Sequence, residues 1–172
     1  QAVHRVLERA WAPHYVMEKR LFANVGGKQL SGQFDLLTPD NILQDYKVTS
    51  YFACKEGPKI EWERQLNVLN YLCLRNDIKV KKLEIVAIIR DWSRTEKKRY
   101  GDKYPDYPVM RIPVNKWGTE QAKEYVVDQM MAHFNPDAKP CTYEERWSKP
   151  TTWAVKKKGT KRALRVFENY VD

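Results

Sequence analysis

Three charged residues stand in an apolar, strand-like part of the chain where a buried strand would normally carry none. They are Asp35 and, ten residues later, Asp45 and Lys47, with Tyr46 between the last two. Residues 38–41 (Thr-Pro-Asp-Asn) form a typical turn sequence between the two groups. Consecutive antiparallel strands would bring Asp35 near Asp45, and side-chain alternation would put Asp45 and Lys47 on one face.

Two carboxylates and an ammonium in apolar surroundings are costly to bury without a further partner. A divalent metal ion explains the arrangement, because carboxylate oxygens are the ligands that hard cations prefer. Such an ion commonly serves hydrolysis by activating water. The pattern therefore predicts a metal site, with Mg²⁺ or Mn²⁺ as the ion.

The surrounding pattern predicts elements that would position these residues. Apolar spacing indicates helices over residues 1–12, 60–75 and 119–134, and strands over 15–25, 28–37, 42–51, 83–89 and 109–114. Gly26-Gly27 is a hairpin signal, and Pro113 indicates an edge strand. A helix between the third and fourth strands predicts a right-handed crossover. The fold class is therefore α/β: a central mixed β-sheet flanked by helices, with a C-terminal basic β-hairpin.

Composition favours an anionic partner. The chain has 172 residues and a formal net charge of +9, with six Trp and ten Tyr. A basic, aromatic surface suits nucleic acid with unpaired bases, or an anionic membrane. The alternative also stands, because aromatic residues usually fill cores and many basic proteins bind no anion. No apolar run is long enough to span a membrane, and no signal peptide is visible.

The three cysteines, Cys54, Cys73 and Cys141, are widely spaced and form no CxxC motif. This spacing argues against a disulfide framework or a structural zinc site and for a reducing compartment. Each is expected to be a small buried hydrophobic residue.

Two basic segments follow the central strands. Residues 90–107 read as an exposed loop, either a solvated linker or a loop that contacts nucleic acid, and the sequence leaves both open. Residues 153–167 predict a hairpin with basic residues at its tip: Lys156, Lys157, Lys158, Lys161 and Arg162. These are either simply solvated or an arm that grips phosphates. The expected organisation is a core over 1–134 and an extension over 135–172 packed on the same domain.

These residues resemble the PD-(D/E)XK nuclease superfamily. Asp35 and the Asp-Tyr-Lys of residues 45–47 match its D…(D/E)xK pattern, and residues 32–35 match a G-x-x-D motif. Residues 3–8 (Val-His-Arg-Val-Leu-Glu) are similar to the V-H-x-x-L-E helix of the RecB-type branch. That branch includes exonuclease subunits of bacterial recombination machines and CRISPR-associated exonucleases. The tail is similar to small phage-encoded members.

The resemblance implies a restriction-endonuclease-like core and a role for each matching residue. It implies Asp35, Asp45, Lys47 and Gln65 as catalytic residues, and His4, Asp35, Asp45 and the Tyr46 carbonyl as metal ligands. Glu18 is either a surface charge or a helper at the acidic site. The branch pattern Q-x-x-x-Y is not reproduced, because residue 69 is Leu; Tyr71, two residues on, is the alternative nucleic-acid contact. Three scattered cysteines also predict no iron–sulfur cluster.

The function implied is a metal-dependent DNA nuclease, an exonuclease used in recombination, repair or phage genome processing. The alternative is a catalytically inactive nucleic-acid-binding module of the same fold. The expected partners are single- or double-stranded DNA, with a second copy of the chain or a recombination protein as a further partner, and no membrane. The expected location is the cytoplasm, that of the host if the chain is phage-encoded.

Overall fold

The computed structural model describes residues 15–137, 140–143, 146 and 148–168. The chain divides into two compact units, residues 1–134 and 135–172, and each is described by itself. The helix predicted over residues 1–12 lies outside the described residues.

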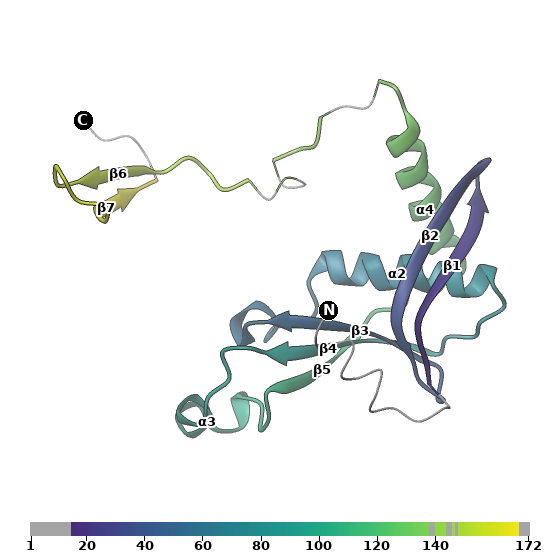
Figure 1. The fold of residues 1–172 in the computed structure, drawn as a ribbon, viewed down its shortest axis with the longest axis horizontal. Helices are drawn as coiled ribbons and strands as arrows, with labels where there is room; N and C mark the ends of the chain where they lie inside the picture. The colour runs from purple at the N-terminus through teal and green to yellow at the C-terminus, as the bar shows by residue number, and fades with distance from the viewer. Residues whose placement is uncertain (1–14, 138–139, 144–145, 147, 169–172) are drawn as a thin grey trace. The chain divides into compact units, whose positions relative to one another are not determined.

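The first unit contains a five-stranded sheet and its helices (Figure 1). The strands are β1 (Val16–Val25), β2 (Lys28–Leu37), β3 (Ile42–Thr49), β4 (Lys82–Ile89) and β5 (Val109–Val114). The helices are α2 (Ile60–Arg75), α3 (Arg94–Tyr100) and α4 (Thr119–Phe134), with short 3-10 turns at Tyr51–Ala53 and Gly101–Lys103.

The strand order is β1-β2-β3-β4-β5, so β5 is an edge strand, as Pro113 predicted. β3 and β4 are parallel, and the other neighbouring pairs are antiparallel. A parallel pair needs a crossover connection, and α2 supplies it between β3 and β4. The predicted fold class, a mixed central sheet flanked by helices with a C-terminal hairpin, is confirmed.

The β1–β2 hairpin turns at Gly26 and Gly27, whose φ angles of 56° and 76° favour glycine. Gly32, farther along β2, has a different role. A Cβ atom there would lie 2.8 Å from Leu72 Cδ1 and 2.9 Å from Leu69 Cδ2. The bare glycine therefore lets α2 lie directly against the β2 backbone.

The core lies between the sheet and α2. The predicted apolar stripe of α2 is buried, with Leu66 and Cys73 fully enclosed. β4 is buried along most of its length, as its continuous apolar sequence predicted for a covered interior strand. α4 buries Ala122 and Val126, while Phe134, also predicted on its inner side, is 49% exposed because it ends the helix.

The three cysteines differ in burial. Cys54 and Cys73 are buried as predicted, but Cys141 is exposed, so the prediction was wrong for that residue. It lies in the second unit, where even the β6 and β7 strands bury none of their residues fully, and thus offers no core to enclose a thiol. Burial raises the pKa of the Cys73 thiol to about 11, although the positive charge of nearby Lys19 acts to lower it.

Thiol labelling should follow this division. At pH 8 we expect one thiol in the native protein, Cys141, to react rapidly with an aromatic disulfide reagent, because only a solvated thiolate attacks it. All three thiols should react in denaturant. A Cys141→Ser variant should lose the rapid phase, whereas rapid reaction of that variant would contradict the burial of the other two.

The segment 90–107 is more ordered than the predicted loop. It contains α3, whose first turn is capped by Ser93, the side chain of which accepts a hydrogen bond from Glu96 N at 3.1 Å. The Ser-x-x-Glu sequence is a capping signal that the loop prediction overlooked.

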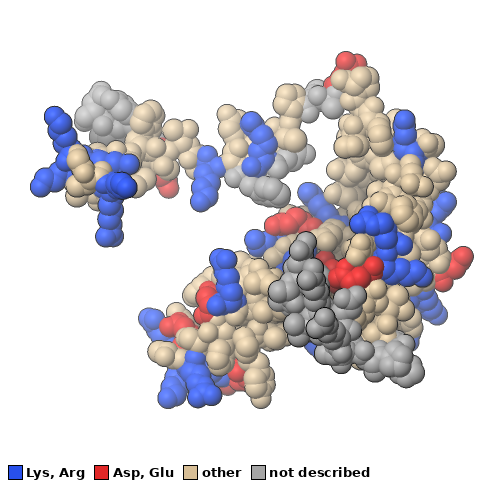
Figure 2. Space-filling view, viewed as in Figure 1, with Lys and Arg blue, Asp and Glu red and all other residues tan. Residues whose placement is uncertain are grey.

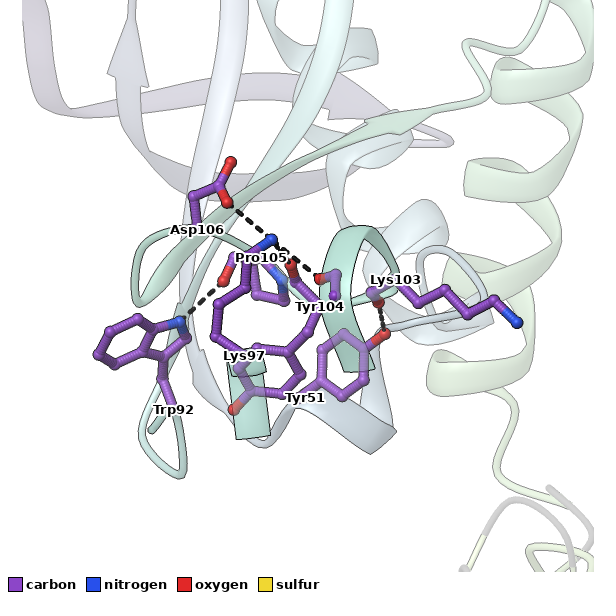
Figure 3. A network of polar contacts seen from close by, with 8 residues as sticks. Tyr51, Trp92, Lys97, Lys103, Tyr104, Pro105 and Asp106 are labelled. Atoms are coloured by element: carbon purple, nitrogen blue, oxygen red, sulfur yellow. Dashed lines mark hydrogen bonds and ion pairs between the residues drawn. The ribbon is translucent and has the colours of Figure 1, made fainter. Parts of the chain in front are cut away.

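Side chains also tie this segment to the 3-10 turn after β3 (Figure 3). Lys97 Nζ donates to the carbonyls of Gly101 and Tyr104, both at 2.9 Å, and pairs with Asp106 at 2.7 Å. Trp92 Nε1 donates to the Pro105 carbonyl, and the Tyr51 hydroxyl donates to the Lys103 carbonyl. Lys97 is therefore bound within the fold and does not serve as a solvated phosphate contact.

The second unit contains the predicted hairpin, formed by β6 (Trp153–Lys156) and β7 (Ala163–Phe167). Its connection spans residues 157–162 and includes Gly159 at a φ of 84°. The predicted basic residues of this tip are all exposed. Lys and Arg side chains project from this unit in several directions (Figure 2).

Within the described part of the chain, none of the helices is both long enough and apolar enough to cross a membrane.

Candidate active site

The candidate site lies where β2 and β3 separate. Their pairing consists of Leu37 with Leu43 and Leu36 with Gln44. The next pair in this register would be Asp35 with Asp45, but no pairing continues there. β2 follows β1 instead, while β3 stays beside β4 through Thr49 (Figure 1). Asp35 and Asp45 thus lie at the first position after β2 and β3 separate, a point called the fork below.

Asp35 replaces the lost strand pairing with its side chain. Its Oδ2 accepts a hydrogen bond from the backbone N–H of Tyr46 at 2.8 Å. A backbone N–H without a strand partner needs another acceptor, and the carboxylate supplies it. In an antiparallel pair, the N–H and C=O of one residue point to the same side. The Tyr46 carbonyl therefore faces the same gap between the strands, as the predicted ligand role requires.

Asp45, Lys47 and Gln65 form a closed set of contacts between β3 and α2. Lys47 Nζ lies 2.7 Å from Asp45 Oδ2 and donates to Gln65 Oε1 at 2.9 Å. Gln65 Nε2 donates to Asp45 Oδ1, also at 2.9 Å. The prediction that Asp45 and Lys47 share one face is confirmed. Gln65 orients both charged groups, because its amide donates to one and accepts from the other.

Burial differs sharply within this set. The Asp45 side chain is 4% exposed, whereas that of Lys47 is 24% exposed. A carboxylate so deeply buried requires a positive neighbour, and the ammonium of Lys47 supplies it. The ammonium itself reaches solvent, where it can meet a substrate.

Tyr46 lies between the two charged residues of β3 with its side chain in a different environment. Burial raises the pKa of its phenol, and the negative charge of Asp35 raises it further. The phenol is therefore neutral at physiological pH. The predicted role of this residue therefore rests on its carbonyl alone.

Glu18 stands across from Asp35. Met17 pairs with Leu36 and Lys19 with Phe34, so Glu18 occupies the opposing position on β1. Its φ of 49° is unusual for a residue other than glycine and breaks the regular pairing there. Its Oε2 accepts from Gln33 Nε2 at 2.5 Å. Glu18 therefore lies at the acidic end of the hairpin, where a helper role was one of the two alternatives.

Gln33 and Arg20 belong to the same polar group and were not predicted. Arg20 donates to Gln33 Oε1 at 3.2 Å and to Ser31 Oγ at 3.4 Å. A second unpredicted pair is Gln44, which is buried, and Glu84, joined at 2.5 Å. Arg20 and Gln33 occupy exposed positions where polar residues are ordinary, so the local signal was Gln44, a polar residue at a buried position of β3. Its partner lies on another strand, so sequence alone did not identify it.

The donor set fits a hard divalent cation. Asp35 and Asp45 contribute carboxylates and Tyr46 contributes a carbonyl, all of them oxygen ligands. The described residues contain no group of three His, Cys, Asp or Glu side chains arranged as a metal site. The predicted set does not require one there, because His4 lies outside the described residues and the Tyr46 ligand is backbone.

Tyr71 was expected to contact nucleic acid, and the structure corrects this. Its side chain is 5% exposed and packs in a second core cluster with Val25, Ala122 and Val126. Six residues after Gln65, it points about 240° around the helix axis from that residue. The ring is therefore a core residue between α2, the β1–β2 hairpin and α4.

The predicted basic residues of the hairpin belong to the second unit, and the acidic site belongs to the first. Each is described in its own unit, and the hairpin residues are exposed side chains on a two-stranded ribbon.

Comparison with known proteins bears on the fold only. No protein-family model and no curated protein matches the chain. A solved structure titled "Crystal structure of SSO0001" is similar, with a TM-score of 0.51 and 19% sequence identity. The match covers 79% of this chain and 60% of that chain, so this chain spans less than two thirds of its length. At this identity, the likeness shows a shared α/β fold.

Proposed function

We propose that this chain is a metal-dependent DNA nuclease that degrades strands from an end. The observation that carries the proposal is the closed contact set of Asp45, Lys47 and Gln65 beside Asp35, at the fork between β2 and β3. The carboxylate can serve as a ligand of a divalent cation, and the partly solvated ammonium can stabilise negative charge on a phosphate. The resemblance to PD-(D/E)XK nucleases assigns these same residues to catalysis.

Asp35, Asp45 and the Tyr46 carbonyl would hold Mg²⁺ or Mn²⁺, with His4 as a further ligand. When bound, the ion would act as a Lewis acid and would lower the pKa of a coordinated water. Lys47 orients the attacking water and stabilises negative charge that develops on the phosphate. Gln65 holds the side chains of Lys47 and Asp45 in position. Glu18 adds negative charge beside Asp35.

The biological setting follows from the same proposal. The net charge of +9 favours nucleic acid as the substrate, and the resemblance implies DNA and a role in recombination, repair or phage genome processing. We propose a cytoplasmic location, with a second copy or a recombination protein as a further partner. An inactive binding module would have no need to retain a closed Asp, Lys and Gln set.

A cleavage assay tests this function. Linear and circular DNA, each single- and double-stranded, are incubated with Mg²⁺, Mn²⁺ or EDTA. We expect linear DNA to be degraded with either metal, circular DNA to survive, and EDTA to stop the reaction. A Lys47→Ala variant should cut nothing. Failure to cut any substrate, or equal cutting by that variant, would overturn the proposal, and cutting of circular DNA would overturn the exonuclease assignment.

The basic hairpin is proposed to grip phosphates, and salt dependence tests this separately. Each lost phosphate contact should reduce the slope of log affinity against log salt concentration by about 0.7 to 0.9. We therefore expect Lys157→Gln, Lys158→Gln and Lys161→Gln together to lower the slope by about two units, as measured by fluorescence anisotropy. A control replaces Lys79, Lys81 and Lys82, also exposed lysines, by Gln. Equal slopes for the two triple variants would contradict a specific hairpin contact.

A further inference from the structure

A groove adjoins the candidate active site and shares one of its residues. It has a volume of about 510 Å³ and lies between β2, α2 and α4. Gln65 lines it while also contacting Asp45 and Lys47. Ligand pockets typically have volumes of about 300 to 1,000 Å³, so the groove can take a group of nucleotide size.

One wall of the groove is an aromatic ring held in place. Tyr125 of α4 lines it, and the edge-on Trp117 ring lies 5.1 Å from the Tyr125 ring between centroids. Trp117 is itself anchored, because its Nε1 donates to Glu63 Oε1 at 2.6 Å. The Arg64 guanidinium lies 6.0 Å from the centroid of the Tyr125 ring. A supported ring beside a guanidinium is a stacking surface for a planar group.

The polar side chains of the groove suit the edge of a base. Arg64 and Glu61 both line it, and Glu61 also pairs with Lys59 at 3.9 Å. The edge of a nucleobase carries donors and acceptors that suit a guanidinium and a carboxylate.

We propose that this groove binds an unpaired nucleotide of the strand being cut, with its base stacked on Tyr125 and its edge read by Arg64 and Glu61. The inference rests on the proposed function and adds a substrate class: a single strand, or a duplex end that has frayed. A base within a duplex is stacked on both faces and paired along one edge, so it cannot enter the groove.

Binding without cleavage tests the groove directly. Single-stranded oligonucleotides carrying 2-aminopurine at successive positions from one end are mixed with the protein in EDTA. Stacking quenches this base, so we expect quenching at a defined position in the wild type. A Tyr125→Leu variant should lose that quenching and bind the oligonucleotide about tenfold or more weakly. Tyr125→Phe, which keeps the ring, should behave as the wild type.

Two controls separate stacking from folding. Arg64→Gln alters an exposed side chain outside the Trp117 contact and should also weaken single-strand binding. Tyr107→Leu removes a ring that is 75% exposed and lies outside the groove, and it should have no effect. A closed circular duplex, which has no end to fray, should bind the wild type and Tyr125→Leu equally. Quenching and affinity unchanged in both Tyr125→Leu and Arg64→Gln would overturn the inference.

The outcomes also distinguish this inference from the nuclease proposal. Position-specific quenching that depends on Tyr125, in a protein that cuts no DNA with any metal, would support the groove and overturn the nuclease. Cleavage by the wild type, with Tyr125→Leu and Arg64→Gln binding single strands normally, would overturn the groove and support the nuclease.

Discussion

Replacing Asp45 by Asn is expected to reduce DNA cleavage by about 10²- to 10³-fold or more while the fold survives. Asn keeps the shape of Asp, but its single oxygen can accept from only one of Gln65 and Lys47, and it lacks the negative charge that a divalent cation needs. The measurement is the initial rate of degradation of end-labelled DNA in Mg²⁺ and in Mn²⁺. Single-strand affinity in EDTA should change little, because no metal is bound there.

The unfolding free energy of Asp45→Asn should fall below that of the wild type, because the variant loses the ion pair with Lys47 and can keep only one of the two contacts of the carboxylate. Asp128→Asn is the matched control, because Asp128 is an exposed acid on α4. Cleavage by Asp45→Asn at the rate of Asp128→Asn would remove Asp45 from the mechanism.

Replacing Asn67 by Ala is expected to lower the free energy of unfolding by about 3 kcal/mol, since it leaves buried backbone groups without partners. Asn67 is fully buried, and its Oδ1 accepts from Trp117 N at 2.8 Å. Its Nδ2 donates to the carbonyls of Glu63 and Asn115, both at 2.9 Å. One amide thus joins α2 to the segment between β5 and α4.

Urea denaturation measures this loss. Asn70→Ala, the same truncation one turn along α2 at a half-buried position, should cost much less and serves as the control. A loss below about 1 kcal/mol for Asn67→Ala would show that the bridging amide contributes little. The same variant should also weaken the groove beside Tyr125, because Trp117 supports that ring.

Local patterns predicted most of the elements. β2, α2, β5 and α4 begin and end where apolar spacing, Gly26-Gly27 and Pro113 placed them. These signals depend on neighbouring residues only, because alternation and helical spacing are properties of one segment. The missed helix α3 is instructive, since its Ser93 cap was also local and was overlooked among the surrounding charges.

Contacts between segments were harder to predict. Tyr71 was assigned to the substrate, and its burial depends on α4 and the β1–β2 hairpin, both distant in sequence. Tyr125 was expected on the inner side of α4, but nothing in the sequence indicates that it shares a groove with Gln65. Cys141 was predicted to be buried like the other two cysteines, and its exposure follows from the lack of a core in the second unit.

The candidate site shows the same division. The residue types and spacing of Asp35, Asp45 and Lys47 determined which groups could perform the chemistry, because alternation along a strand already puts Asp45 and Lys47 on one face. Only the tertiary structure decided that β2 leaves β3 at Asp35, that Gln65 closes the contact set, and that a groove begins there. The physical reason is that side-chain direction along one strand is a local property, whereas strand separation and helix packing depend on the whole buried core.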